Sequence, residues 1–243
     1  MLVAVLSDIH ANRHAFEAVL DDVAASEAAE TWCLGDVVGY GGDPNECVAL
    51  AVEHCHVLLA GNHDMAVTGA VSLEDFTRGA ALAARWTQEV LDEDAMERLT
   101  SLIPAGDEHG IGVFHASPRD PVWEYVTSAL QSELCLDATD FRVNLIGHSH
   151  MALSFWRPEG GAATGETRQA NDVMDVSKGE WLMNPGSVGQ PRDGDPRAAW
   201  MLLDTGTWTA TWKRTEYDVA GAQAAIRAAR LPDSLAERLE YGQ

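Results

Sequence analysis

Five short polar motifs in the first 150 residues carry side chains that commonly bind metal ions. Together they offer imidazole, carboxylate and amide groups but no thiolate. This mixture suits Mn, Fe or Zn better than a structural zinc site or an all-oxygen calcium site, so it predicts metal-dependent chemistry. In chain order the motifs are Asp8-Ile9-His10, Gly35-Asp36, Gly61-Asn62-His63-Asp64, His115 and Gly147-His148-Ser149-His150.

The spacing within two of these motifs favours a shared centre. In an extended segment, residues i and i+2 point to the same side, so Asp8 and His10 could serve one ion. The same holds for His148 and His150. Taken alone, an Asp-x-His triplet is ordinary turn chemistry and His115 is an ordinary core histidine. The occurrence of all five motifs in order favours one common site.

Each motif directly follows a short apolar run that predicts a buried strand. Helical patterns separate the early runs. Asn12 is the expected N-cap of a helix through about residue 26, and Pro44 begins a helix through Val52. This alternation favours a mainly parallel sheet with helices outside. Loops beyond the carboxyl ends of such strands converge on one crevice, where the motifs should meet. The predicted strands are 2–6, 31–34, 57–60, 111–114 and 143–146.

The second half of the chain is predicted to be richer in strands. A polar loop with three glycines is expected at 158–171, and Asp204-Thr205-Gly206 is a candidate hairpin turn. No internal repeat or clear linker interrupts the pattern, so a single domain over 1–243 is predicted. The further strands are expected at 151–157, 180–183, 198–204 and 207–213, and the further helices at 73–102, 127–137 and 218–229.

The composition narrows the range of partners. The formal net charge is −22, from 38 acidic and 16 basic residues. A surface this negative repels long polyanions, so nucleic acid is disfavoured. Small phosphorylated molecules are less affected, because bound metal ions can reverse the potential locally.

The cellular setting is also suggested by sequence. The four cysteines lack zinc-knuckle or redox spacing, which predicts reduced thiols in a cytoplasmic protein. The N-terminus has no basic leader, and no apolar run approaches the ~20 residues of a membrane span. We therefore expect neither a signal peptide nor membrane association.

In order and residue type, the five motifs resemble the signature of the calcineurin-like metallophosphoesterases. The resemblance spans residues 8–150 and continues in Asn184-Pro185-Gly186-Ser187, which is similar to the small bacterial and archaeal phosphodiesterase branch. It implies an α/β fold, an αββα four-layer sandwich of two mixed sheets flanked by helices. It also implies a cofactor of two metal ions, Mn, Fe or Zn.

The resemblance further implies a role for each motif residue. Asp36 would bridge the two ions, and a hydroxide between them would attack phosphorus in line. His63 would not be a ligand; it would face the substrate as general acid for the leaving group. One ion would be held by Asp8, His10, Asp36 and His150, and the other by Asp36, Asn62, His115 and His148.

One departure from the family pattern bears on the substrate. Protein phosphatases of this superfamily continue the Gly-Asp motif with an Asp and an Arg, where this chain has Gly39 and Tyr40. A small phosphodiester is therefore favoured as substrate. Its phosphate is expected to meet Asn12, Arg13 or Arg192. The alternatives are a phosphomonoesterase, a protein phosphatase, a nuclease that the charge disfavours, or a non-catalytic protein-binding scaffold. A homo-oligomer is possible.

Overall fold

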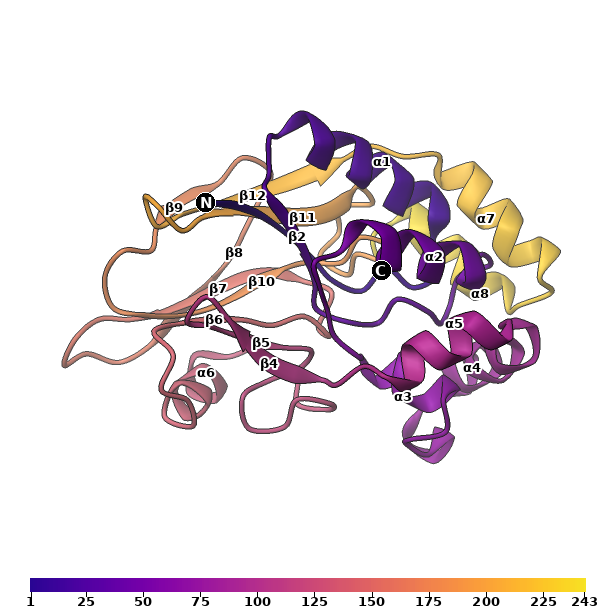
Figure 1. The fold of residues 1–243 in the computed structure, drawn as a ribbon, viewed down its shortest axis with the longest axis horizontal. Helices are drawn as coiled ribbons and strands as arrows, with labels where there is room; N and C mark the ends of the chain where they lie inside the picture. The colour runs from indigo at the N-terminus through magenta and orange to yellow at the C-terminus, as the bar shows by residue number, and fades with distance from the viewer.

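The protein, described by a computed structural model over residues 1–243, contains two six-stranded sheets that face each other (Figure 1). In spatial order, the first sheet consists of β3 (Val57–Leu58), β2 (Glu30–Cys33), β1 (Leu2–Leu6), β11 (Ala198–Asp204), β12 (Thr209–Thr215) and β9 (Val173–Asp175). The second consists of β4 (Ala105–Glu108), β5 (Ile111–Phe114), β6 (Val143–Leu145), β10 (Glu180–Pro185), β7 (Ala152–Arg157) and β8 (Thr164–Thr167).

Helices cover the outer faces of both sheets. On the first sheet α1 lies against β11 and β12, and on the second α6 lies against β7 and β10 (Figure 1). None of the helices is long and apolar enough to cross a membrane. The helices are α1 (Arg13–Ala25), α2 (Pro44–His54), α3 (Asn62–Val67), η1 (Leu73–Asp75), α4 (Arg78–Val90), α5 (Glu93–Thr100), α6 (Ala129–Leu136), α7 (Val219–Ala228), α8 (Asp233–Glu237) and η2 (Arg238–Glu240).

The apolar run of β1 shows why the chain forms layers. Successive strand residues point to opposite faces. Val3 and Val5 enter the core between the sheets, whereas Ala4 and Leu6 enter the core beneath the helices of the first sheet. A strand covered on both faces needs a continuous apolar run rather than alternation, and β1 has one. This arrangement confirms the expected αββα sandwich.

The expectation of a mainly parallel sheet was only partly correct. β1, β2 and β3 are parallel to one another, but β11 joins β1 antiparallel, with Leu2 opposite Asp204. In the second sheet β10 is parallel to β6 and antiparallel to β7. The β-rich second half supplies strands to both sheets. The local sequence pattern of a strand does not show which of the two sheets it joins.

The region predicted to be helical at 73–102 contains three helices. It divides into η1, α4 and α5, because two side chains cap new helix starts. The Thr77 hydroxyl accepts a hydrogen bond from the Ala80 amide, and the Asp92 carboxylate accepts one from the Ala95 amide at 2.8 Å. The predicted loop at 158–171 contains β8, an edge strand whose four residues are all exposed and show no apolar alternation.

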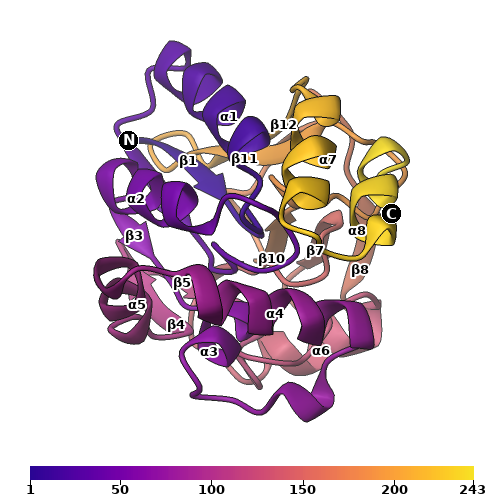
Figure 2. The same ribbon diagram turned by 90° about the vertical axis from the view of Figure 1, so that its right-hand side faces the viewer.

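The carboxyl ends of five strands meet at one end of the sandwich. The Asp8 amide donates to the Gly35 carbonyl, which joins the loops after β1 and β2. The Gly147 amide donates to the His115 carbonyl, which joins the loops after β6 and β5. Figure 2 views the molecule from this side, with α4 below and α7 and α8 above. Both sheets thus present motif residues to the same place.

Candidate metal centre

Six side chains from these loops form two overlapping groups whose ligand atoms lie within 4.8 Å of one another. All six are buried. The two groups share Asp36, whose Oδ2 lies 3.6 Å from both His10 Nε2 and His115 Nε2. The first group is Asp8, His10, Asp36 and His150, and the second is Asp36, His115 and His148.

Backbone carbonyls orient three of the four rings. His10 Nδ1 lies 3.1 Å from the Val38 carbonyl, and His150 Nδ1 lies 2.7 Å from the Gln190 carbonyl. His115 Nδ1 is similarly placed against a carbonyl at 2.9 Å. Because a carbonyl can only accept, each Nδ1 carries the proton and each Nε2 directs its lone pair into the cluster. This is the tautomer that metal ligation requires.

The first group contains a close approach that a cation would relieve. His10 Nε2 and His150 Nε2 are 3.0 Å apart, and with both Nδ1 atoms protonated their lone pairs face each other. Burial lowers the pKa of both rings well below the ordinary histidine value. Protonation is therefore disfavoured, and a metal ion is the species that fits between the two nitrogens.

The two carboxylates each use one oxygen to support the loops and leave the other free. Asp8 Oδ2 accepts from the His148 amide at 3.1 Å, and Asp36 Oδ1 accepts from the His63 amide at 2.8 Å. Asp8 Oδ1 and Asp36 Oδ2 are buried with no hydrogen-bond partner, as is His148 Nε2. Burying an unpaired acceptor is costly. Bound metal ions would satisfy all three atoms, so the donor set fits them.

A pH dependence follows for the metal-free protein. Burial raises the pKa of Asp8 from 3.8 to about 7. Between these values the unfolded chain releases this proton and the folded chain keeps it, so folding stability falls as pH rises from about 4 to 7. Relative to Asp8→Asn, the free energy of unfolding of wild type should fall by up to about 1.4 kcal/mol per pH unit. Denaturant unfolding of both proteins in chelator would measure this; parallel pH profiles would contradict it.

Asn62 and Asp64 have different roles within the third motif. Asn62 Oδ1 lies 3.1 Å from His115 Nε2, where it can complete the second group of ligands. The Asp64 carboxylate instead accepts from the amides of Gly61, Val37 and Val38, at 2.9, 3.3 and 3.1 Å. Asp64 therefore ties the start of α3 to the loop that carries Asp36.

His63 lies in the cavity wall but belongs to neither ligand group. No carboxylate orients it, and its Nδ1 is buried without a partner. It packs instead between Tyr40 and Phe76, with ring centroids 4.4 and 4.9 Å away. Gly39 explains why no acid from position 39 orients His63. A Cβ at Gly39 would lie 2.4 Å from His63 Nδ1, and the φ angle of Gly39 is +92°. A side chain at position 39 would displace the ring.

The ligand loops adopt left-handed backbone conformations that few non-glycine residues use. The φ angles of Asp8 and His10 are 56° and 52°, and those of His148 and His150 are 63° and 58°. The argument that i and i+2 share a side in extended backbone was therefore wrong in its geometry. The paired residues still converge, because each loop turns sharply after its strand. Such strain is typical of functional sites.

A small cavity of about 120 Å³ opens onto the cluster. Pockets for drug-sized molecules are roughly 300–1,000 Å³, so only a small group fits without movement. Aromatic rings line it: Phe76 and Trp123 meet at 5.4 Å, and Tyr125 lies over His148 at 4.0 Å. The sequence reasoning missed these three residues, because an aromatic residue in a loop carries no local signal of its partner.

The three candidate substrate-binding residues are placed differently. Arg192 lines the cavity. Asn12 is buried outside it: its amide nitrogen donates to the Gly189 carbonyl and its oxygen caps α1. Arg13 is half-exposed and faces Glu17. Neither Asn12 nor Arg13 lines the cavity, so their contact with substrate stays a prediction.

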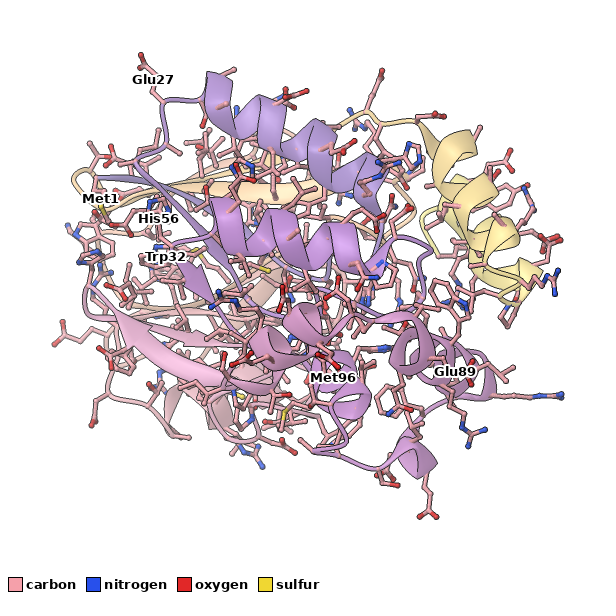
Figure 3. The ribbon with its side chains drawn as sticks, turned by 45° about the vertical axis from the view of Figure 1, so that its right-hand side comes forward. Met1, Glu27, Trp32, His56, Glu89 and Met96 are labelled. Carbon is pink, nitrogen blue, oxygen red and sulfur yellow. The ribbon has the colours of Figure 1, made fainter.

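Other histidines lie far from the cluster, at the end where β1 begins. Figure 3 shows Met1 and His56 at this end. His56 Nδ1 accepts from the Thr31 amide, and His109 lies 3.5 Å from the carboxylate of Glu30. These contacts give both rings structural or surface roles.

Comparison with known proteins agrees with this geometry. Residues 1–207 match the calcineurin-like phosphoesterase superfamily domain, and the chain belongs to this family. A crystal structure of a metallophosphoesterase from Sphaerobacter thermophilus is 39% identical, with a TM-score of 0.91 over 100% of this chain and 99% of that one. An uncharacterized protein of Methanocaldococcus jannaschii is 37% identical over 252 residues, covering 100% of this chain and 98% of the relative.

A more distant structure shows how far the fold extends. A hypothetical protein from Pyrococcus horikoshii is 19% identical, with a TM-score of 0.79 over 100% of this chain and 98% of that chain. At this identity the likeness concerns the fold alone. The family membership and the buried cluster together define a metallophosphoesterase with a site that could bind metal ions.

Proposed function

We propose that this protein hydrolyses small phosphate esters, most favourably diesters, with two metal ions held in the cluster. The observation that carries the proposal is the set of buried, unpartnered acceptors on Asp8, Asp36 and His148, in two ligand groups that share Asp36. Mn, Fe and Zn all suit these ligands. When bound, the ions would activate a water and neutralise charge on the phosphoryl oxygens.

The chain itself contributes binding and proton transfer. Arg192 lines the cavity beside the cluster, where its guanidinium can bind an anionic oxygen of the substrate. His63 lies on the same wall, so its ring can give a proton to the leaving oxygen. The small cavity limits water around the reacting groups and favours small esters.

The choice of a diester depends on what surrounds His63. The Asp and Arg that serve protein phosphatases of this superfamily are replaced by Gly39 and Tyr40, and the structure leaves no room for an acid at position 39. A small phosphomonoester is the second candidate, because the volume of about 120 Å³ suits one. A purely scaffolding role is disfavoured, because it would not require this buried set of unpaired ligands.

A metal-resolved assay tests the proposal. Chelated protein should be inactive, and Mn, Fe or Zn should restore hydrolysis of bis-p-nitrophenyl phosphate at a higher kcat/KM than p-nitrophenyl phosphate. The release of p-nitrophenolate is followed by absorbance. A reversed preference would indicate a monoesterase. No turnover of either ester with any metal would favour the scaffold and refute the enzyme.

A further inference from the structure

Two arginines lie side by side at the edge of the cavity. Arg192 Nη2 and Arg238 Nη1 donate to the same acceptor, Gln190 Oε1, at 3.0 and 3.1 Å. Both guanidinium groups also lie near the Tyr40 ring, 5.7 and 6.0 Å from its centroid. Residues from three distant segments thus place two positive charges at one point.

Neither arginine has a carboxylate within 4.0 Å, although the chain carries a net charge of −22. Two other partly buried arginines are neutralised: Arg157 binds Glu180 and Arg214 binds Asp193. Two unneutralised guanidinium groups at one acceptor repel each other. Burial, and next the charge of Arg192, lower the pKa of Arg238.

The pair is held in place rather than free to separate. Gln190 is buried, and its backbone carbonyl also binds His150 Nδ1. Arg238 begins η2, whose Leu239 packs in a buried cluster with Tyr40. The Nε and one further nitrogen of each guanidinium have no acceptor in the protein. The molecule therefore keeps a preorganised pair of cations with free donors.

We propose that Arg192 and Arg238 together bind a second anionic group of the substrate. The substrate class is then a phosphate ester whose alcohol portion carries a carboxylate or another phosphate. This proposal rests on the proposed function. Arg192 lines the cavity next to the cluster, whereas Arg238 lies beyond it. The reacting phosphate would sit at the ligand groups, and the second anion between the two arginines, which suits bidentate recognition.

Substrates that differ by one carboxylate test this assignment. For each of the 2-, 3- and 4-carboxyphenyl phosphates and for phenyl phosphate, phosphate release is measured with the manganese-loaded protein. Wild type should favour at least one carboxylated ester. Arg238→Gln should lower kcat/KM for that ester at least tenfold, mainly through a higher KM. The kcat/KM for phenyl phosphate should change by less than twofold. Arg238→Lys should retain part of the preference, and Arg85→Gln, on the exposed face of α4, should match wild type.

Two outcomes would overturn the proposal. Equal losses for phenyl phosphate and the carboxylated esters would mean that Arg238 only positions Gln190. Unchanged kinetics for every ester would mean that Arg238 binds no part of the substrate.

Binding of phenylphosphonate and the carboxyphenylphosphonates, measured by calorimetry, separates this proposal from the proposed function. Tighter binding of a carboxylated phosphonate that Arg238→Gln abolishes would support the anion site even if no ester were hydrolysed. Equal affinity of wild type for all phosphonates would refute it even if esters were hydrolysed.

Discussion

Replacing Asp36 by asparagine is expected to release metal from both ligand groups and to reduce ester hydrolysis by at least about 100-fold. Asp36 Oδ2 lies 3.6 Å from a ring nitrogen in each group, so it is the one atom positioned to serve both. An asparagine would keep an oxygen to accept from the His63 amide, and its neutral amide would replace the charged ligand. The loop should therefore stay folded while the metal is lost.

Metal analysis and thermal unfolding measure this result. Burial raises the pKa of Asp36 well above the ordinary value, so the charged form is disfavoured in the metal-free protein. Metal-free Asp36→Asn should therefore be at least as stable as metal-free wild type. Added Mn or Zn should raise the melting temperature of wild type but not of the variant. Asp140→Asn, at an exposed position, is the control. Two tightly bound ions in Asp36→Asn would exclude the bridging role.

Replacing His63 by alanine is expected to preserve metal content and to slow hydrolysis by about 10²–10⁴-fold for esters with poor leaving groups. The ring lies in the cavity wall outside both ligand groups, so its loss removes a proton donor rather than a ligand. Esters of p-nitrophenol should be affected less, because this leaving group departs without a proton. The dependence of rate on leaving-group pKa should steepen in the variant.

Two further variants make this prediction specific. His63→Gln retains most of the ring's volume between Tyr40 and Phe76 but cannot act as a general acid, so it should resemble His63→Ala. His14 lies on α1 and faces Asp218, so His14→Ala should behave as wild type. If His63→Ala slowed all esters equally, the ring would act by packing alone. Turnover equal to that of wild type would remove His63 from the mechanism.

The candidate metal ligands and their positions at strand ends followed from sequence alone. An apolar run that ends in a glycine and a polar residue determines local structure over a few residues, and β1, β2 and β5 ended within one residue of the prediction. The five motifs also carry the family resemblance, because each keeps its ligand types within a short segment. The order of the strands in the second sheet could not be predicted in this way, since strand pairing joins segments far apart in the chain.

The features that shape the substrate site were decided by tertiary structure. His63 lacks an orienting acid because Gly39, on another loop, leaves space that the ring fills. Phe76 and Trp123 meet although they are 47 positions apart in the sequence, and Gln190 and Arg238 are 48 positions apart. No local pattern encodes such contacts, because they depend on packing between layers. The sequence by itself thus determined a buried set of candidate metal ligands, and the fold decided what surrounds them.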